Sequence, residues 1–317
     1  MKRVIITGPT GVVGMALTKY LSERGIQVIT VVRPDSSRKS QIRESESLIK
    51  VECPLAEISG LSGKVKEAFL RRGQPVWQNI DVFYHLAWDG TYADSRDDLY
   101  LQNRNVAYAL EAVDAAAKLG CRLFIGAGSQ AEYGRYEGKL HAKLPVFPEN
   151  GYGMAKLCAG QMTRSQCEKK GLGHIWTRIL SVYGPYDNAR TMVMGSIQKM
   201  LRGERVSCTK GEQLWDYLYA ADAAKMMYLL GKYGKCGSTY CLGSGEARPL
   251  KEYMEIIRSI VSPQADIGYG EIAYSPKQVM HLCADIHEIV IDTGYQPDYT
   301  FESGIRQTME WCLKYNM

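Results

Sequence analysis

The chain has 317 residues, with 39 lysines and arginines against 34 aspartates and glutamates, so its formal net charge is a modest +5. The basic residues form no cluster that would bind nucleic acid, and no apolar run approaches the roughly 18 residues of a membrane span. The nine cysteines are scattered without metal-ligand spacing, and the apolar run 4–6 is too short for a signal peptide, so we expect a cytoplasmic protein with reduced thiols and no metal site.

The first half of the chain alternates short apolar segments with longer helical patterns. Valine and isoleucine are frequent in the apolar segments, as expected of strands buried on both faces of a sheet. The predicted strands are 3–7, 27–32, 48–51, 82–86, 123–126 and 175–180, and the clearest predicted helices are 15–24, 99–119 and 152–169. This alternation predicts an α/β fold of the Rossmann type, a doubly wound parallel sheet with helices on both faces.

The regular alternation weakens after about residue 180. Helical patterns recur at 192–201, 220–230 and 250–261, with short strands expected near 206 and 239. We expect residues 1–180 to form the Rossmann domain and residues 181–317 to form a smaller C-terminal α/β domain that binds the substrate. A later segment near 214–240 is expected to return to the first domain.

A glycine-rich turn follows the first predicted strand. It reads Thr7-Gly8-Pro9-Thr10-Gly11-Val12-Val13-Gly14 and opens a predicted helix. Glycines permit a tight turn and let backbone N–H groups approach a pyrophosphate, which the N-terminus of the helix also attracts. Its place between a strand and a helix predicts an NAD(P) site in the domain 1–180, with contacts from Gly8, Thr10, Gly11, Val12, Val13 and Gly14.

The end of the second predicted strand bears on which dinucleotide is bound. NAD sites of this kind carry an acidic residue about 20 positions further on, which binds the ribose 2′-hydroxyl. Here Arg33 occupies that position, and a guanidinium would pair with the 2′-phosphate of NADP(H). The alternative is that Arg33 is a solvated loop residue and that Asp35 reaches the ribose. The sequence favours NADP(H) and leaves NAD(H) open.

A phenol and an ammonium group lie four residues apart at Tyr152 and Lys156, on one face of a predicted helix. A lysine so placed lowers the pKa of the phenol, which can then exchange a proton near neutral pH. Tyr228 and Lys232 share the spacing, but only the first pair follows Ser129, which lies just beyond a predicted strand. Ser129 is expected either to hydrogen-bond the substrate oxygen or to satisfy the backbone of a turn.

With these motifs the chain resembles the extended short-chain dehydrogenase/reductase family, which holds nucleotide-sugar epimerases, dehydratases and ketoreductases. Further landmarks of that family follow in order along nearly the whole chain: Tyr84-His85-Leu86-Ala87, Asn105-Val106, Tyr133-Gly134, Arg178, Tyr183-Gly184-Pro185, Trp215-Asp216-Tyr217, Asp222, Gly243-Ser244-Gly245 and Asp285. The resemblance implies a catalytic trio of Ser129, Tyr152 and Lys156, and a homodimer formed through the two long helices of the first domain. It also implies cofactor contacts from Leu86, Ala87, Tyr152 and Lys156, the lysine reaching the nicotinamide ribose.

The resemblance leaves several reactions open. Dehydratases of the family carry an Asp-Glu pair directly after the serine or threonine, where this chain has Gln130 and Ala131. Members that epimerise at two carbons carry a cysteine two residues before the tyrosine of the Tyr-Gly pair, where this chain has Ala131. The remaining reactions are those of a 4-ketoreductase, which consumes NADPH, and of a 4-epimerase, which retains NAD. Because of Arg33 we expect an NADPH-dependent 4-ketoreductase of a nucleotide-linked sugar. The alternatives are the 4-epimerase and a non-catalytic dinucleotide-binding sensor.

The substrate-binding positions depart from the family pattern. The arginine usually found before Asp216, which binds the nucleotide diphosphate, is Trp215, and the position of a second arginine is Ser275. The usual asparagine three residues after Arg178 is Ser181. A diphosphate would then be held by other groups, such as Lys277, or the substrate lacks one. The expected substrate contacts are Trp88, Ser129, Gln130, Ser181, Arg190 and Trp215.

Overall fold

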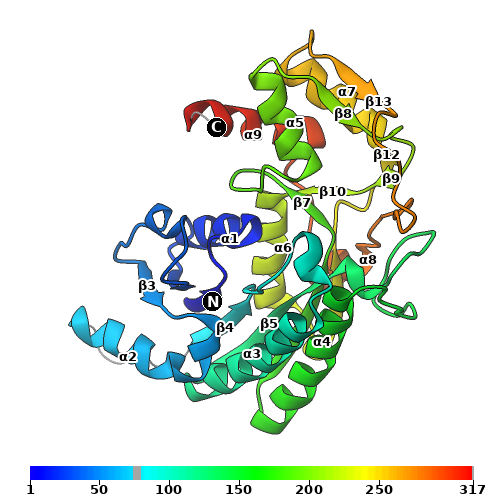
Figure 1. Cartoon of the computed structure of the whole chain (residues 1–317). Helices are drawn as coiled ribbons and strands as arrows, with labels where there is room; N and C mark the ends of the chain where they lie inside the picture. The colour runs from blue at the N-terminus through cyan, green and yellow to red at the C-terminus, as the bar shows by residue number, and fades with distance from the viewer. Residues whose placement is uncertain (74–79, 316–317) are drawn as a thin grey trace.

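A computed structural model describes residues 1–73 and 80–315, and its centre is a seven-stranded parallel sheet (Figure 1). The strands are β1 (Arg3–Thr7), β2 (Gln27–Val32), β3 (Leu48–Glu52), β4 (Ile80–His85), β5 (Cys121–Ser129), β6 (Gly173–Ile179) and β11 (Thr239–Leu242). Their order is β11-β6-β5-β4-β1-β2-β3, which reverses between β1 and β4. The predicted doubly wound fold is confirmed, and ligands of such folds bind at the point of reversal.

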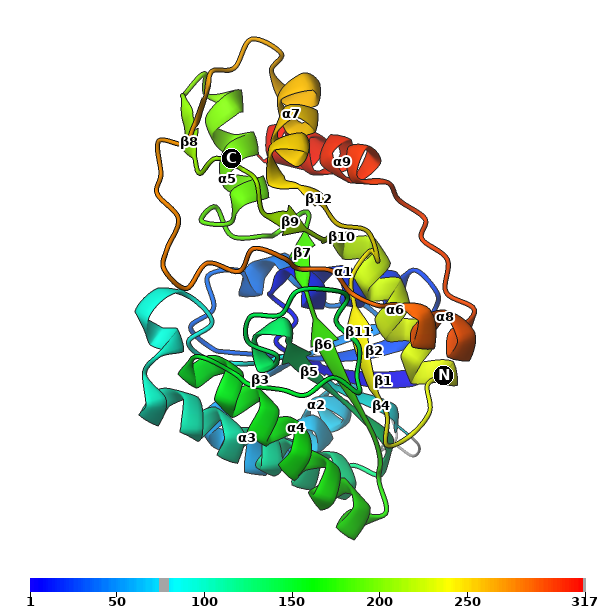
Figure 2. The same ribbon diagram turned by 90° about the vertical axis from the view of Figure 1, so that its right-hand side faces the viewer.

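Helices cover both faces of this sheet (Figures 1 and 2). The helices α2 (Leu61–Arg71), α3 (Leu99–Lys118) and α4 (Gly151–Lys170) cover one face, and α1 (Val12–Ser22), α6 (Ala220–Tyr233) and α8 (His287–Thr293) cover the other. Alternate residues of β1 face opposite layers: Ile5 packs with α2 and α3, whereas Val4 and Ile6 pack with α1 and α6. The sheet is therefore buried on both faces, which explains why valine and isoleucine are frequent in its strands.

Strand β5 is longer than the sequence predicts. We expected it to end near Gly126, but residues 127–129 continue the parallel pairing with residues 177–179 of β6. A side chain on either Gly126 or Gly128 would overlap the indole of Trp176. The two glycines are needed for close packing against Trp176. The strand ends at Ser129, which therefore lies at the carboxyl end of the sheet.

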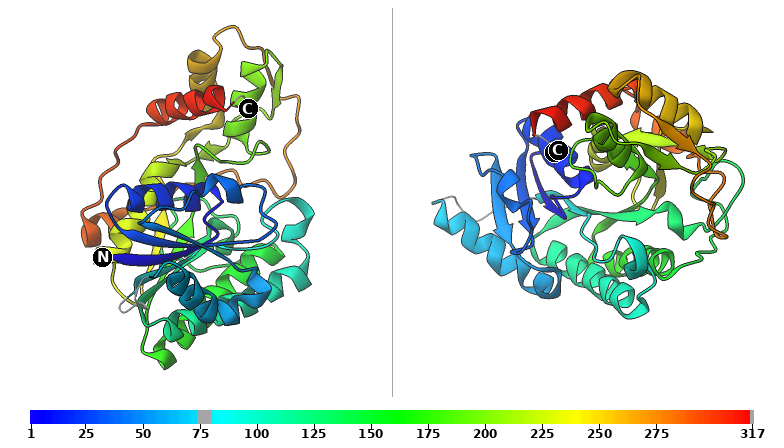
Figure 3. Two further views of the ribbon diagram at one scale, coloured as in Figure 1. Left: turned by 90° about the vertical axis from the view of Figure 1, so that its left-hand side faces the viewer. Right: turned by 45° about the horizontal axis from the view of Figure 1, so that its top comes forward.

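A smaller unit lies beyond the carboxyl ends of the strands (Figures 2 and 3). It contains α5 (Met192–Leu201), α7 (Leu250–Val261) and α9 (Phe301–Lys314), with three two-stranded sheets that pair β7 (Ser181–Tyr183) with β10 (Tyr217–Tyr219), β8 (Val206–Cys208) with β13 (Ile267–Tyr269), and β9 (Leu214–Trp215) with β12 (Arg248–Pro249). Its core joins Met194, Ile197, Met254 and Ile305 from the three helices. The unit stands over the edge where the sheet's ligand crevice opens.

The chain passes repeatedly between the sheet and the smaller unit. After β10 it returns through α6, which packs against α1, and adds β11 beside β6. It returns again at α8, which packs against α6 and which the sequence analysis did not predict. Short 3-10 helices, η1 (Lys39–Gln41), η2 (Leu55–Gly60), η3 (Ala93–Arg96) and η4 (Gln130–Glu132), lie in the connections. In the described residues, no helix has the length and apolarity needed to cross a membrane.

Candidate active site

The glycine turn after β1 is packed so closely that side chains would not fit at two of its glycines. Gly8 has φ +67°, and a Cβ added to it would lie 2.7 Å from the amide nitrogen of Ala87. A Cβ on Gly14 would overlap the carbonyl oxygen of Gly8. Helix α1 begins after Gly11, and no side chain caps its first N–H groups. These donors are directed at the crevice, as a pyrophosphate-binding turn requires, so the residues present fit a dinucleotide.

Two adjoining cavities of about 700 and 530 Å³ open from this turn. The first extends to the end of β2, and the second extends under the smaller unit. The predicted cofactor residues Gly8, Thr10, Gly11, Val12, Arg33, Leu86 and Ala87 line the first cavity, and Val13, Gly14, Ser129, Tyr152 and Lys156 line the second. The structure thus brings the predicted cofactor and catalytic residues into one continuous crevice.

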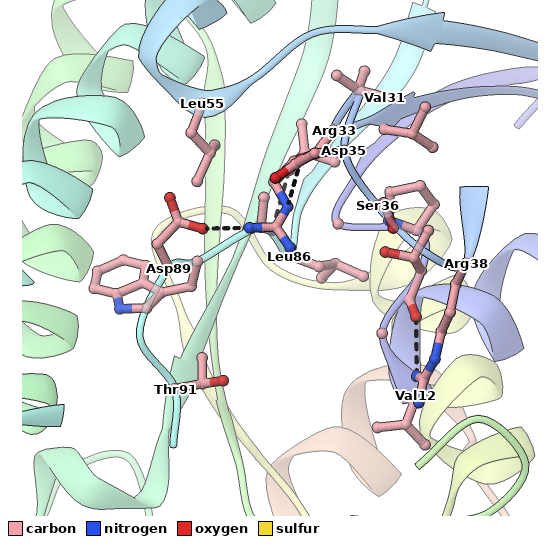
Figure 4. A pocket seen from close by; sticks show the side chains of 18 of the residues that line it. Val12, Val31, Arg33, Asp35, Ser36, Arg38, Leu55, Leu86, Asp89 and Thr91 are labelled. Atoms are coloured by element: carbon pink, nitrogen blue, oxygen red, sulfur yellow. Dashed lines mark hydrogen bonds and ion pairs between the residues drawn. The ribbon is translucent and has the colours of Figure 1, made fainter. Parts of the chain in front are cut away.

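Two arginines line the first cavity, Arg33 beside Asp89 and Arg38 beside the start of α1 (Figure 4). The Nη1 of Arg33 is 3.2 Å from Asp89 Oδ1, and its Nε is 3.9 Å from Asp35 Oδ1. Arg38 donates from Nη1 to the carbonyl oxygens of Thr10, at 3.4 Å, and of Tyr186. The sequence analysis missed Arg38, because nothing in the sequence shows that the loop after β2 folds back onto the glycine turn.

Tyr152 and Lys156 lie in the first two turns of α4, which Asn150 caps by accepting from the Gly153 N–H at 2.8 Å. Lys156 Nζ donates to the Ala127 carbonyl at 2.6 Å and lies 3.7 Å from the centre of the Trp88 ring. Burial lowers the pKa of Lys156 to about 7. This lysine is therefore able to gain and lose a proton near neutral pH.

The cation next to the phenol differs from the one expected. Arg96 Cζ lies 4.4 Å from the centre of the Tyr152 ring, whereas Lys156 Nζ lies 5.7 Å from it. Burial raises the pKa of Tyr152, and a hydrogen bond from Ser129 and the charge of Arg96 oppose that rise. The ammonium group of Lys156 is directed at the Ala127 carbonyl instead.

The backbone of Ser129 is bound by Glu132, which forms a buried ion pair with Arg178. Its N–H donates to Glu132 Oε1 at 2.8 Å, and its Oγ accepts from the Ala131 N–H at 3.2 Å. The carboxylate of Glu132 is fully buried, accepts from Trp176 Nε1 at 3.0 Å and pairs with Arg178 Nε at 2.7 Å. Ser129 therefore caps a short helix and also lines the second cavity, so both of its predicted roles are compatible with the geometry.

The expected substrate contacts divide into two groups. Trp88, Gln130, Ser181 and Trp215 line the second cavity with Ser129, and Trp215 Nε1 donates to Ser181 Oγ at 2.8 Å. Arg190 and Lys277 have exposed side chains and are absent from the described residues that line the two cavities. The structure does not bring these two cations to the site.

Two charged residues of the second cavity were missed by the sequence analysis. Arg96 comes from η3, and Asp187 comes from the loop before α5. Burial raises the pKa of Asp187 to about 6, while Thr191 Oγ1 and the Asn188 N–H each donate to its carboxylate at 2.7 Å. Both residues lie in irregular loops with no recognisable spacing, so no sequence signal marked them.

Some landmarks of the sequence prove to be structural. Asp216 is fully buried and accepts hydrogen bonds from the N–H groups of Ser244, Gly245 and Ala284. Asn105 accepts from the Asp89 N–H and donates to the Asp89 carbonyl, both at 2.9 Å. These side chains fasten the loops around the crevice.

A doubly wound sheet with a dinucleotide crevice of this form defines an enzyme of the extended short-chain dehydrogenase/reductase class. More narrowly, the chain belongs to the NAD dependent epimerase/dehydratase family, whose model matches residues 4–243. Members of this family modify nucleotide sugars.

Known proteins similar to the chain agree with this assignment. A dTDP-glucose 4,6-dehydratase of Shigella flexneri is 29% identical over 193 residues, which cover 56% of this chain and 53% of that protein. The chain thus spans about half the length of the first curated relatives that it matches. A CDP-abequose synthase of Salmonella muenchen is 23% identical over 97% of both chains.

Solved structures share the fold over the full length. A UDP-glucose 4-epimerase from Thermotoga maritima with UDP-glucose has a TM-score of 0.85 at 20% identity, covering 99% of this chain and 100% of that one. A UDP-N-acetylglucosamine 4-epimerase from Methanobrevibacter ruminantium M1, in complex with UDP-N-acetylmuramic acid, has a TM-score of 0.86 at 21% identity and covers 99% of each chain. At these identities the likeness is one of fold.

Proposed function

We propose that the protein is an NADPH-dependent reductase of a keto group, at C4, on a nucleotide-linked sugar. The observation that supports this proposal is that two guanidinium groups, from Arg33 and Arg38, line the cavity at the end of β2. Two arginines suit the 2′-phosphate of NADP(H), which needs charge-assisted donors. The relative named CDP-abequose synthase, matched along nearly the whole chain, supports a nucleotide-linked sugar as the substrate class.

The reaction divides among few side chains. When bound in this crevice, a nicotinamide cofactor would supply the hydride for the carbonyl carbon. Ser129 hydrogen-bonds the carbonyl oxygen, and Tyr152 donates its phenolic proton to that oxygen, which becomes the hydroxyl of the product. Lys156, whose Nζ lies 5.7 Å from the centre of the Tyr152 ring, would bind the cofactor's ribose, and a proton from solvent would restore the phenol. Gln130 and Ala131 follow Ser129, so the acid pair needed to expel water is missing, and we do not propose a dehydratase.

A second function is a 4-epimerase with retained NAD. The observation that favours it is the pairing of Arg33 with Asp35 and Asp89, since either carboxylate could accept a hydrogen bond from ribose hydroxyls. Such an enzyme would interconvert sugars without added reductant. A dinucleotide sensor would show no turnover at all, and its cofactor binding would not depend on Tyr152.

The first test is binding of NADPH and NADH, followed by fluorescence, to the wild type and to Arg33→Ala and Arg38→Ala. We expect each substitution to weaken NADPH binding about tenfold or more, because a charge-assisted contact is lost, and to leave NADH binding nearly unchanged. Arg43→Ala is the matched control, since Arg43 is an exposed arginine outside the cavity lining. Equal affinity for both cofactors in every variant would favour the epimerase.

We also propose a cytoplasmic homodimer formed through α3 and α4. These helices pack side by side, and their outer surfaces expose large apolar side chains: Leu99 at 62%, Tyr100 at 82%, Met154 at 49% and Met162 at 44%. Exposed apolar groups of this size suit a protein interface. Light scattering should give twice the monomer mass, and Met154→Glu with Met162→Glu should return the monomer.

A further inference from the structure

The guanidinium group of Arg96 has no anionic partner in the part of the chain that the structure describes. Arg96 lines the second cavity together with Tyr152 and Ser129. Its guanidinium carbon lies 4.4 Å from the centre of the Tyr152 ring, within cation–π distance. A half-buried arginine without a carboxylate, at the wall of a substrate cavity, is suited to bind an anion from outside the protein.

The backbone that follows Arg96 is held by two hydrogen bonds. Asp97 Oδ1 accepts from the Gly151 N–H at 3.2 Å, at the first residue of α4, and Asp98 caps α3 by accepting from the Leu101 N–H at 3.0 Å. The Arg96 carbonyl also packs closely against Gly151, where a Cβ would lie 3.0 Å away. The backbone of Arg96 is therefore tied to the start of α4, the helix that carries Tyr152.

The donors of Arg96 make no hydrogen bond or ion pair within the part of the chain that the structure describes. A guanidinium group has five N–H groups, which point outward in its own plane. A carboxylate can accept two of these N–H groups at once, in the fork geometry that makes such pairs strong. The arrangement thus presents a ready anion site beside the proton-donating phenol.

The other charged groups of this cavity form hydrogen bonds with groups of the protein. Among the described residues that line it, only Arg96, Lys156 and Asp187 carry charge. Lys156 donates to the Ala127 carbonyl, and the carboxylate of Asp187 accepts from Thr191 and the Asn188 N–H. Arg96 is therefore the cation of this cavity that is free to receive a ligand.

We propose that Arg96 is a substrate-binding residue that receives a carboxylate of the sugar, so that the substrate is a nucleotide-linked sugar acid. The choice of a carboxylate rests on the proposed reaction at C4. In a pyranose the diphosphate is attached at C1, across the ring from C4, whereas a C6 carboxylate is attached at the carbon adjacent to C4. A group held beside Tyr152 is then the carboxylate rather than the diphosphate.

The experiment uses the full chain and measures binding of free glucuronate and of free glucose by saturation-transfer NMR, with NADP⁺ or NAD⁺ present in separate samples. Because it needs no turnover, its result is independent of whether the reductase or the epimerase is correct. The variants are Arg96→Gln and Arg96→Lys. The matched control is Arg306→Gln on α9, an exposed arginine outside the cavity lining. Inorganic phosphate serves as the competing anion.

We expect the wild type to prefer glucuronate to glucose, and Arg96→Gln to lose about tenfold or more of its glucuronate affinity while its affinity for glucose stays the same. Arg96→Lys should keep part of the preference, because it retains the charge and loses the two-point geometry. Unchanged cofactor binding in both variants would show that the crevice is intact. Equal binding of the two sugars by the wild type, a preference that survives Arg96→Gln, or phosphate binding at Arg96 without glucuronate binding would each overturn the proposal.

Discussion

The buried ammonium group of Lys156 should make the free energy of unfolding depend on pH in a way that one substitution removes. Its pKa is about 7 in the folded protein, against an ordinary value of 10.5. Between these values the unfolded chain binds a proton that the folded chain lacks, so stability rises with pH. Below pH 7 both states bind the proton, and the full cost of burying the charge is present.

The magnitude follows from the pKa. Each tenfold change in a protonation equilibrium corresponds to about 1.4 kcal/mol, so the buried ammonium costs about 4 kcal/mol at pH 7. Lys156→Met removes that cost but leaves the Ala127 carbonyl without its donor, which costs about 1–3 kcal/mol. The variant without cofactor should therefore be more stable than the wild type by about 1–3 kcal/mol at pH 7, although it is inactive.

The assay is urea unfolding of the wild type and of Lys156→Met at pH 7, 8 and 9. The wild type should gain about 2 kcal/mol relative to the variant over this range, because the other titrating groups are common to both chains. Lys232→Met is the control, since Lys232 has the same spacing from a tyrosine but is exposed on α6. A difference between wild type and Lys156→Met that does not change with pH would refute the reasoning.

Three further substitutions test the scaffold of the site. Gly14→Val should abolish NADPH and NADH binding, measured by fluorescence, because its side chain would overlap the Gly8 carbonyl; retained binding would contradict the close approach. Glu132→Gln should lower the free energy of unfolding by about 3–5 kcal/mol, because it leaves the Arg178 charge buried and unpaired, and the double variant with Arg178→Leu should recover part of that loss in urea titrations. Asp216→Asn should cost about 1–3 kcal/mol, since an amide cannot accept all the donors around this side chain, and a loss within error of zero would show that they find other acceptors.

The first half of the fold could be predicted because its signals are local. A strand buried on both faces must be apolar throughout, and β1 and β2 carry no polar residue except threonine and the terminal Arg3 and Gln27. The helix bounds at 192–201 and 250–261 also match α5 and α7, whose apolar faces form one core. The length of strand β5 was underestimated, because Gly126 and Gly128 interrupt its apolar sequence although both serve close packing against Trp176.

The candidate site was predictable only where the fold itself places residues. Gly8 and Ser129 follow or end parallel strands, and Tyr152 starts the helix beside them, so the sheet brings them together without further information. Arg38, Arg96 and Asp187 reach the crevice from loops whose path depends on side chains distant in sequence. The spacing of residues along the sequence does not reveal the path of such loops. For the same reason Arg190, which the sequence suggested, lies outside the cavities.

The repeated passage of the chain between the sheet and the smaller unit limits how the molecule can be divided. A chain cut after residue 180 would lack β11, which leaves the edge of β6 open, and would lack α6, whose Met226 and Leu230 cover the apolar face of the sheet. Such a fragment should aggregate when expressed alone. Co-expressed with residues 181–317, it should recover through strand and helix complementation, which makes this enzyme a candidate split reporter whose assembly restores cofactor binding.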